Sequence, residues 1–474
     1  MKKFFICLLM IMHLVDTAQH PPKKLFVATK QSLAGRAMPQ WFGDAKLGIF
    51  IHWGLYSVPA WATPTTTPDK VTDWKAFYAS NPYAEWYLNS LRIAQSPTQL
   101  HHQKMYGSAY DYYHFKDSLL QKSKNLTMAS WANLFAKIGA KYVVFTTKHH
   151  DGFTMYPSKI INPFKSSAAI NSPRDFVDEL CKSVRKSGMK FGVYYSGGLD
   201  WTFNETPITN LWPDLFESMP KQDAYARYAE SQYYELIKRY QPDILWNDIN
   251  YPANGNLLNI FSTLFNSNSE AVVNDRWQQY AALTNFTTPE YQVLDSIAAQ
   301  KWETCRGLGY SFGYNQLEGD GELLSSKKLI ELLIDVVSKN GNLLLNVGPK
   351  ADGSIPENQL KRLTDLGNWM SINSEGIYAT TPYTIAAAKL KDDTELRFTK
   401  KGNNVYIFLF SLPKNNSIFI PHCHTSKSSK VFLYGANRQP LAYSAAGDGI
   451  NITLPKNVAF NFAQMVKVTN VQEK

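Results

Sequence analysis

Short runs of apolar residues that end in polar ones recur along the first three quarters of the chain. Within a run, the apolar residues are not separated by polar ones, which is typical of strands buried on both faces of a sheet. We therefore predict buried strands in six segments: LGIFIHWG (47–54), KYVVFTTKHHDGF (141–153), FGVYYSGG (191–198), ILWND (244–248), AVVNDRW (271–277) and NLLLNVGP (342–349).

Helix-like segments precede five of these runs. They are TMASWANLFAKIGA, DFVDELCKSVRKSGM, DAYARYAESQYYELIKRY, NLLNIFSTLF and LIELLIDVVSKNG, in chain order. Strands that alternate with helices imply right-handed crossovers and a parallel sheet. Six such units fit a (β/α)8-type (TIM-like) barrel better than a doubly wound sheet. The glycines of SGGLDW are not followed by a helical pattern, so a dinucleotide-binding fingerprint is not indicated.

The pattern changes from about Ile377 onward. ELRFTKKGNNVYIFLFSLP predicts two strands around a Gly-Asn turn, and SIFIP, KVFLYG, GINITLP and FAQMVKVTN predict further short strands. We expect a small antiparallel β-sandwich that supports the barrel. The predicted division is a signal peptide at 1–18, a catalytic barrel at 19–376 and a C-terminal β-sandwich at 377–474.

The first residues, MKKFFICLLMIMHLVDTAQ, have the pattern of a secretory signal. Lys2 and Lys3 form its positive end, Phe4 to Met12 form its apolar core, and cleavage after Ala18 is predicted. The apolar core is too short to span a bilayer, and no later segment has the composition of a membrane helix. We expect an exported protein that is periplasmic, secreted or lysosomal, depending on the host.

Export makes the N-x-S/T sequons relevant, because they matter only where the host glycosylates exported proteins. Cys7 lies in the signal segment. The three remaining cysteines make no disulfide framework, and whether two of them form a single bridge stays open. The sequons begin at Asn125, Asn204, Asn285, Asn415 and Asn451.

Composition narrows the functional classes. The 474 residues are 44% hydrophobic and 19% charged, as in ordinary globular proteins. The net charge of +10 is spread along the chain without a Lys/Arg block, so a nucleic-acid partner is not indicated. Aromatic residues make up 14% of the chain, and most of them are explained by core packing. The oligomeric state, including a homo-oligomer, stays open.

Polar residues follow directly on the predicted strands. In a parallel barrel, the carboxyl ends of the strands form the functional face, so these residues are expected to meet there. Asp248 ends a buried strand, and a buried carboxylate is costly unless it is paired. A barrel that needed only stability would not carry polar residues at every strand end. The polar strand ends are His52; Lys148, His149, His150 and Asp151; Tyr194, Tyr195 and Ser196; Asn247 and Asp248; and Asn274, Asp275 and Arg276.

Two chemistries lack their sequence patterns. A metal site is not expected, because His149 and His150 would point to opposite sides of a strand and no H-E-x-x-H spacing occurs. The H-x-H of His422 and His424 lies in the tail, away from the strand ends. No G-x-S-x-G motif indicates a nucleophilic serine.

A pair of carboxylates is the remaining chemistry. Asp248 supplies the first carboxylate, and Glu290 in TTPEYQ or Glu303 in KWET supplies the second. We also expect an internal ion pair between Lys148 and Asp151.

Several motifs resemble the α-L-fucosidases of glycoside hydrolase family 29. They are LGIFIHWGLYSVPAW, NPYAEWY, KYVVFTTKHHDGF, FGVYYSGGLDW, PDILWND, VNDRW and LLIDVVSKNGNLLLNVGPKADGSIP. The resemblance covers about residues 40 to 375 in order. It implies a retaining exo-hydrolase that removes terminal α-L-fucose from fucosylated oligosaccharides or glycoconjugates, without a metal or an organic cofactor.

The same resemblance assigns roles to single residues. Asp248 matches the nucleophile, and Glu290 resembles the acid/base, with Glu303 as the runner-up. Spacing alone does not separate Tyr194 from Tyr195. Fucose is a 6-deoxy sugar, so its pocket needs one apolar side, for which Phe312 and Trp86 are suited. The residues that match sugar-binding positions are His52, Glu85, Trp86, His149, His150, Tyr194, Arg276 and Phe312.

A retaining mechanism has two physical requirements. The two carboxyl groups should lie roughly 5–5.5 Å apart, and Asp248 must be ionised while Glu290 starts protonated. Two other functions stay open: a non-catalytic fucose-binding protein on a barrel scaffold, and a hydrolase of a related sugar such as an α-galactoside or β-arabinoside. Linkage preference also stays open.

Overall fold

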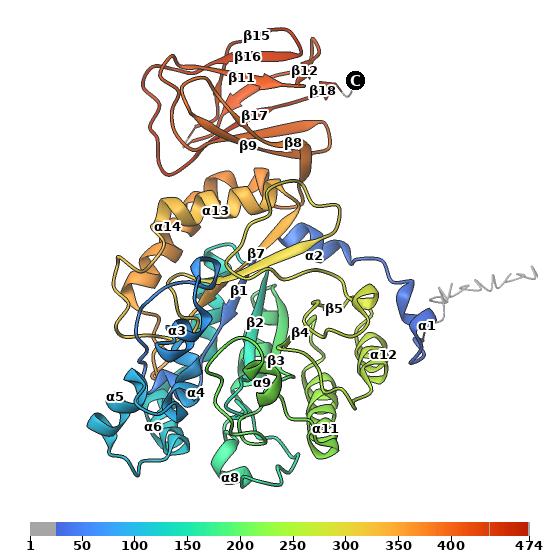
Figure 1. Cartoon of the computed structure of the whole chain (residues 1–474). Helices are drawn as coiled ribbons and strands as arrows, with labels where there is room; N and C mark the ends of the chain where they lie inside the picture. The colour runs from blue at the N-terminus through green and yellow to red at the C-terminus, as the bar shows by residue number, and fades with distance from the viewer. Residues whose placement is uncertain (1–24, 436, 473–474) are drawn as a thin grey trace, which may run out of the picture.

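A computed structural model describes residues 25–435 and 437–472, so the predicted signal segment lies outside the described residues. A parallel sheet surrounded by helices is followed by a separate set of antiparallel strands (Figure 1). The first strand of the second part, β8, begins at Thr381.

Seven parallel strands form the central sheet, in the order β5-β4-β3-β2-β1-β7-β6. All six strands predicted from apolar runs are present, and β6 is an additional strand that the sequence pattern did not reveal. Its sequence WETCRG mixes polar and apolar residues instead of forming an apolar run. The strands are β1 (Leu47–Ile51), β2 (Tyr142–Lys148), β3 (Lys190–Ser196), β4 (Ile244–Asp248), β5 (Val272–Val273), β6 (Trp302–Gly307) and β7 (Gly341–Val347).

Residues 286–290 close this sheet into a ring. Phe286 bridges Asn274, which follows β5, while Thr287 and Glu290 bridge Trp302 and Cys305 of β6. The segment therefore occupies the eighth position, which confirms the predicted (β/α)8-type barrel. It is an irregular strand, and the fully described connections on either side of it, 274–285 and 291–301, contain no α-helix.

Helices cover the outside of the sheet (Figure 1). Several of the larger ones begin at side-chain caps, such as Asp175, whose carboxylate accepts from the amide of Asp178, and Ser325, whose hydroxyl accepts from the amide of Lys328. The helices of ten or more residues are α5 (Pro97–Tyr106), α7 (Met128–Lys137), α9 (Phe176–Lys186), α11 (Asp223–Tyr240), α12 (Leu257–Ser267), α13 (Ser326–Ser338) and α14 (Glu357–Asn373). The shorter ones are α1 (Lys30–Ala34), α2 (Gln40–Ala45), α3 (Trp74–Ala79), α4 (Tyr87–Arg92), α6 (Phe115–Lys122), α8 (Ser167–Ile170) and α10 (Asp214–Ser218).

Alternate residues of each strand belong to two different cores. Phe50, Val144 and Trp246 pack together inside the barrel, whereas Ile49 and Val143 pack against the surrounding helices. This two-sided burial explains why the strands read as continuous apolar runs. It also fixes which side chain at each strand end points inward.

The C-terminal strands form a six-stranded sheet, a three-stranded sheet and a two-stranded pair. The predicted Gly-Asn turn joins β9 to β10, while β8 was missed because its residues are mostly exposed or half-buried. The strands are β8 (Thr381–Lys389), β9 (Glu395–Lys401), β10 (Asn404–Leu409), β11 (Ser417–Pro421), β12 (His424–Thr425), β13 (Val431–Leu433), β14 (Gln439–Pro440), β15 (Tyr443–Ala445), β16 (Gly449–Thr453), β17 (Gln464–Val468) and β18 (Val471–Gln472).

The barrel and the C-terminal sheets are joined through α13. Its Asp335 forms an ion pair with Arg397 of β9, and the ammonium of Lys327 donates to the carbonyl of Phe410 at 2.9 Å. Further along the chain, Glu375 pairs with Lys467 of β17. The second part is thus attached on the helical side of the barrel by charged contacts and by apolar packing, since Phe408 and Met465 belong to the same core as Trp369 of α14.

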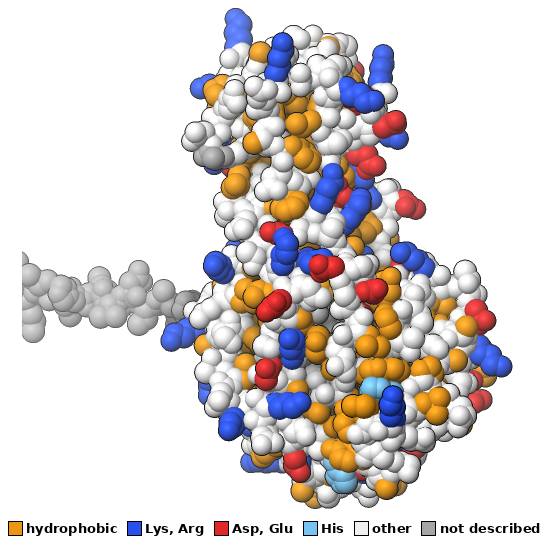
Figure 2. Space-filling view, turned by 90° about the vertical axis from the view of Figure 1, so that its left-hand side faces the viewer, with side chains coloured by type: hydrophobic (Ala, Val, Ile, Leu, Met, Phe, Trp, Pro, Cys, Tyr) orange, Lys and Arg blue, Asp and Glu red, His pale blue; other side chains and the backbone are white. Residues whose placement is uncertain are grey.

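The surface carries charges of both signs. On the face shown in Figure 2, Lys and Arg side chains are interspersed with Asp and Glu over both parts of the molecule. Among the described residues, no helix combines the length and apolar character needed to cross a bilayer. The three described cysteines, Cys181, Cys305 and Cys423, are all free and buried, so the bridge left open by the sequence is not formed.

Candidate active site

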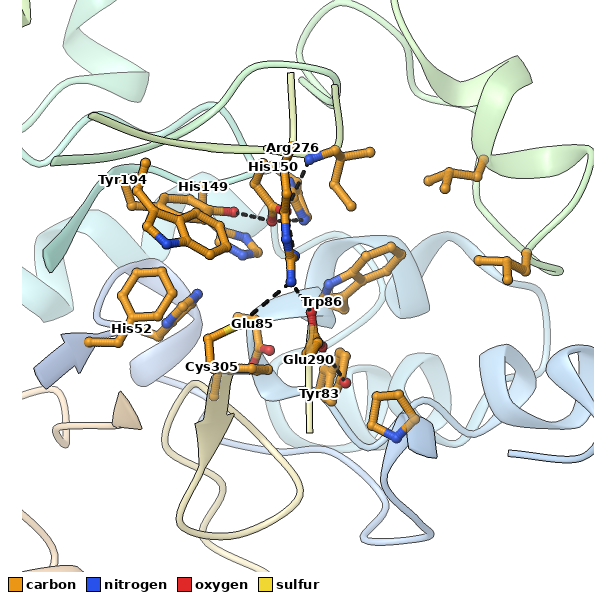
Figure 3. A pocket seen from close by; sticks show the side chains of 18 of the residues that line it. His52, Tyr83, Glu85, Trp86, His149, His150, Tyr194, Arg276, Glu290 and Cys305 are labelled. Atoms are coloured by element: carbon orange, nitrogen blue, oxygen red, sulfur yellow. Dashed lines mark hydrogen bonds and ion pairs between the residues drawn. The ribbon is translucent and has the colours of Figure 1, made fainter. Parts of the chain in front are cut away.

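A cavity of about 290 Å³ lies at the carboxyl ends of the barrel strands. It brings together Asp248, Glu290 and every residue expected to bind sugar, whereas Glu303 does not line it. Figure 3 shows that the labelled side chains come from several strand ends and from the short 3-10 helix Ala84–Trp86, which carries Glu85 and Trp86. The sugar-binding candidates that line it are His52, Glu85, Trp86, His149, His150, Tyr194, Arg276 and Phe312.

Arg276 extends into the middle of the cavity and contacts both carboxylates (Figure 3). Its Nη1 lies 2.9 Å from Asp248 Oδ1, and its Nη2 lies 3.1 Å from Glu290 Oε2. The guanidinium of Arg276 is also held at its third nitrogen, because Nε donates to the hydroxyl of Thr288 at 3.1 Å. One planar cation therefore fixes the relative position of the two acids.

Asp248 ends β4 and is held in an environment that favours its charged form. Tyr194 donates its hydroxyl to Oδ2 at 2.8 Å, and the amide of Ile249 donates to Oδ1 at 3.0 Å. Burial alone would raise the pKa of Asp248, but Arg276, His150 and these contacts outweigh it and lower the pKa below 3.8. Asp248 is thus ionised at neutral pH.

Glu290 ends the irregular strand of residues 286–290, which occupies the eighth position of the barrel. Its Oε1 accepts from the hydroxyl of Tyr83 at 3.1 Å, while Oε2 contacts Arg276. The Glu290 side chain is 27% exposed, compared with 11% for Asp248. The two acids therefore differ in depth, and Glu290 lies closer to solvent.

Glu303 occupies a different place, inside the barrel below the cavity. It is fully buried and accepts from the hydroxyl of Tyr142 and from Nε1 of Trp246, the latter at 3.1 Å. Burial raises its pKa to about 7, against the opposing effect of those two donors. Its contacts are those of a residue that fills the barrel interior.

Three histidines form part of the cavity floor, and all three are buried. Burial lowers the pKa of His52 to about 3 and that of His150 to about 4, and it lowers the pKa of His149 well below 6.5. All three rings are therefore neutral at neutral pH. A neutral imidazole offers one nitrogen as an acceptor without adding positive charge.

Hydrogen bonds determine which nitrogen of two rings is the acceptor. His52 Nδ1 lies 2.7 Å from the side-chain oxygen of Asn346, so Nδ1 donates and Nε2 accepts. His150 Nδ1 lies 2.6 Å from the hydroxyl of Ser196, which itself donates to the carbonyl of Leu199. The Nε2 atom of His150 is consequently an acceptor, 3.9 Å from Asp248 Oδ2.

The expectation that His149 and His150 point to opposite sides was wrong. β2 ends at Lys148, so neither histidine is on a strand, and both line the cavity with ring centres 4.0 Å apart. His149 stacks on Tyr194, with 5.7 Å between ring centres. Its Nδ1 has no hydrogen-bond partner within the described part of the chain.

Glu85 and Phe312 also belong to the floor. Glu85 Oε2 accepts from the amide of Gly313 at 2.7 Å and from the hydroxyl of Ser311 at 3.1 Å. Burial raises the pKa of Glu85 to about 7 despite these donors. The Phe312 ring lies 5.0 Å from that of His52 and adds an apolar surface beside polar ones.

The alternation of each strand decides between neighbouring residues. Tyr194 points into the cavity, whereas the hydroxyl of Tyr195 donates outward to Gln232 of α11 at 2.7 Å. In β2, a register shift between Thr146 and Lys148 turns Lys148 outward over the Tyr195 ring.

The predicted Lys148–Asp151 ion pair was wrong for this reason. Lys148 Nζ lies 2.7 Å from a carboxylate oxygen of Asp200, and both side chains are fully buried. Asp151 instead accepts from the hydroxyl of Tyr112 and the amide of Phe153. Because Lys148 points outward, His149 and His150, which follow it, line the cavity.

Sequence reasoning missed several residues of the cavity, among them Tyr83, Trp246 and Cys305. Tyr83 stands two residues before Glu85 in the motif NPYAEWY, and Trp246 stands two residues before Asp248. The period of a strand would have indicated Trp246. Cys305, which lies 3.5 Å from Arg276 Nη2, would have been found if β6 had been predicted.

The chain bends sharply just after Asp248. Ile249 and Asn250 have φ angles of 53° and 90°, in the left-handed region that β-branched residues rarely adopt. Such a conformation costs ~1–3 kcal/mol. The bend packs against Gly198, where an added Cβ would meet the carbonyl oxygen of Ile249 at 1.6 Å. Amides of Gly197 and Gly198 donate to the carbonyl of Asp248 and hold the bend.

In the described residues, no group of three or more His, Cys, Asp or Glu side chains is arranged to hold a metal ion. His422 and His424 both contact Asp448 in the C-terminal part, far along the chain from the cavity residues.

Comparisons with known proteins identify the family of this chain. A protein-family model described as "Alpha-L-fucosidase" matches residues 13–375, and a second, described as "Alpha-L-fucosidase C-terminal domain", matches residues 391–469. The chain is 31% identical to the tissue alpha-L-fucosidase of Homo sapiens, with 95% of this chain and 93% of the human protein covered. It is 30% identical to an alpha-L-fucosidase of Dictyostelium discoideum, with 95% and 92% covered.

A solved structure is similar as well. The Thermotoga maritima alpha-fucosidase in complex with a mechanism-based inhibitor superposes with a TM-score of 0.85 at 41% identity. The match covers 94% of this chain and 100% of the solved chain.

Ionisation of Glu85 lowers the stability of the wild-type protein as the pH rises. We predict that Glu85→Gln removes this contribution. The pKa of Glu85 is about 7 in the folded state, compared with 4.5 for an ordinary glutamate, so the folded protein keeps a proton that the unfolded chain releases. Between these values the free energy of unfolding falls with rising pH, by on the order of 1–3 kcal/mol. The glutamine variant lacks this contribution.

Urea unfolding at pH 5 and pH 8 measures the effect. The free energy of unfolding of Glu85→Gln, relative to wild type, should increase from the lower to the higher pH. Glu357→Gln, at an exposed position of α14, is the matched control. A difference between Glu85→Gln and wild type that is the same at both pH values contradicts the assignment.

Proposed function

The chain belongs to the α-L-fucosidase family, and from this premise we propose that Asp248 and Glu290 carry out the hydrolysis in the cavity described above. The protein is an α-L-fucosidase, a glycoside hydrolase that acts on fucosylated substrates. One observation carries the assignment of the two acids. They contact the two terminal nitrogens of a single guanidinium at the edge of a buried polar floor.

Asp248 is the nucleophile of the first step. Its carboxylate oxygen attacks the anomeric carbon, the bond from that carbon to the leaving oxygen breaks, and a glycosyl ester forms. Glu290 gives its proton to the leaving oxygen in the same step. The lowered pKa of Asp248 supports this role, because the attacking group must be ionised.

Water completes the reaction in the second step. Glu290, now a carboxylate, takes a proton from a water molecule whose oxygen attacks the anomeric carbon, and the ester bond to Asp248 breaks. The greater exposure of Glu290 supports this exchange of partners. A retaining pair should lie roughly 5–5.5 Å apart in the catalytic arrangement.

The neutral histidines suit the transition state of this reaction. Positive charge develops on the sugar ring, so a protonated imidazole beside it would be repelled. His52 and His150 instead present unprotonated Nε2 atoms, which accept hydrogen bonds from sugar hydroxyls. Arg276, the only cation among the described residues that line the cavity, is already paired with two carboxylates.

The apolar side of the floor favours a 6-deoxy sugar. Phe312 and Trp86 offer no hydrogen-bond partner at their ring faces, so a hydroxymethyl group in place of a methyl would lose its bonds to water there. This disfavours an α-galactoside. The ionised Asp248 and the second acid beside it disfavour a binding protein without catalysis.

We predict that Asp248→Gly abolishes turnover of 4-nitrophenyl α-L-fucoside. Loss of a covalent nucleophile lowers kcat by roughly 10⁴–10⁶-fold. The glycine leaves space at the end of β4, so azide should enter and yield a fucosyl azide of the opposite anomeric configuration. Near-normal turnover by a correctly folded Asp248→Gly variant contradicts the assignment.

We predict different effects for Glu290→Ala and its matched control, Glu303→Ala. Loss of the acid/base should slow hydrolysis of fucosylated oligosaccharides by about 10²–10⁴-fold and affect 4-nitrophenyl α-L-fucoside less, because 4-nitrophenolate leaves without a proton. Azide should restore turnover in Glu290→Ala. Glu303→Ala should lower stability without azide rescue. The reverse pattern assigns the role to Glu303.

We also propose that the protein is exported and, in a host that modifies exported proteins, glycosylated. The signal-like pattern of residues 1–18 supports export to the periplasm, the medium or the lysosome. Asn125, Asn415 and Asn451 are exposed, whereas the Asn285 side chain accepts from the amide of Val273. N-terminal sequencing should find a mature chain that begins at Gln19, and a chain that keeps Met1 contradicts export by cleavage.

A further inference from the structure

The outer part of the cavity wall differs in character from its floor. The outer residues belong to loops or short helices that follow the strands, not to the strands themselves. Most are half-buried or exposed, in contrast to the buried histidines, Glu85 and Tyr194. We call them the rim: Pro68, Trp74, Leu211, Leu215, Ile249 and Gln292.

The rim is apolar. None of these described rim residues is charged, and Gln292 is the one with a polar side chain. Trp74 extends the apolar surface inward, because its ring lies 6.2 Å from that of Tyr78, which in turn lies 5.5 Å from Trp86. A continuous strip of aromatic rings thus connects the rim to the floor.

The rim borders the place where the reaction releases its first product. Ile249 directly follows Asp248, and Gln292 lies two residues after Glu290. Since Glu290 protonates the leaving oxygen and is the more exposed acid, the leaving group extends from Glu290 toward the solvent. That direction leads across the rim.

The conformation of Ile249 is an independent indication. Glycine would adopt its φ of 53° without steric cost, whereas isoleucine is strained there. The strained bend places an apolar side chain on the cavity wall beside the nucleophile. A function of that side chain at the cavity explains why the bend carries a bulky residue.

We propose that Trp74, Leu211, Leu215 and Ile249 form a leaving-group subsite for a ring with an apolar face, such as an aryl group or the less polar face of a pyranose. This inference rests on the proposed function of Asp248 and Glu290. The subsite binds the group attached to fucose and does not take part in bond breaking.

Two substrates separate this subsite from the catalytic groups. α-L-Fucosyl fluoride has a leaving group too small to reach the rim, whereas 4-nitrophenyl α-L-fucoside carries a ring. The ratio of their kcat/KM values, ring substrate over fluoride, should fall about tenfold in Trp74→Ala, as expected for loss of one apolar contact. It should fall similarly in Ile249→Asn, because asparagine tolerates the left-handed conformation.

Phe216→Ala is the matched control. Phe216 follows Leu215 on α10, is 45% exposed and does not line this cavity. The ratio should be unchanged in this variant, and thermal unfolding should show that all three variants are folded.

Three outcomes are distinguishable. A lower ratio in both rim variants, with the control unchanged, supports the subsite. An unchanged ratio in folded Trp74→Ala and Ile249→Asn overturns the subsite and leaves the proposed function intact. A wild-type protein that releases fucose from neither substrate overturns both.

Discussion

The contact of one guanidinium with two carboxylates is the constraint on which the catalytic arrangement depends. Arg276 is placed by the loop after β5, and it reaches Asp248 at the end of β4 and Glu290 at the end of the eighth strand. Two carboxylates at the edge of a buried floor would otherwise repel each other and shift toward their protonated forms. The guanidinium offsets this effect at Asp248, which has a lowered pKa despite its burial. The pairing therefore permits a buried anion where the chemistry requires one.

The remaining polar groups of the floor are neutral or nearly so. His52 and His150 are held in one tautomer by Asn346 and Ser196, and burial keeps them unprotonated. The floor thus recognises hydroxyl groups through oriented acceptors instead of through charge. This arrangement is compatible with a sugar that becomes positively charged during the reaction, and it confines the strong electrostatic interactions to Arg276 and its two partners.

Much of the barrel was predictable because parallel strands buried on both faces give apolar runs that are readable without knowledge of their neighbours. β6 escaped because Glu303 and Arg306 interrupt its apolar pattern, although Glu303 is buried inside the barrel. The placement of Asp248 at a cavity followed from its position at a strand end. The choice of Tyr194 over Tyr195 did not, since it depends on which face of β3 turns inward, and that is set by packing across the whole barrel.

Loop-borne residues were harder to foresee for a related physical reason. Tyr83 reaches Glu290 from a segment more than 200 positions earlier, and no local pattern encodes such a contact. The partner of Lys148 likewise depends on a register shift in β2 that only the paired strands reveal. Local periodicity predicts elements, while irregular pairing and long-range contacts determine the final direction of individual side chains.

The backbone segments that carry the two acids differ in how extensively they are paired with their neighbours. Asp248 ends a strand that is paired with β3 along its full length and with β5 at its start, whereas Glu290 ends a segment attached by isolated bridges and flanked by connections without α-helices. A nucleophile must approach one carbon atom from one direction, which favours a well-restrained backbone. A proton carrier serves two oxygen atoms in succession, first that of the departing group and then that of water. Arg276 holds Glu290 beside Asp248, while the isolated bridges of residues 286–290 restrain the backbone of Glu290 less than strand pairing restrains that of Asp248.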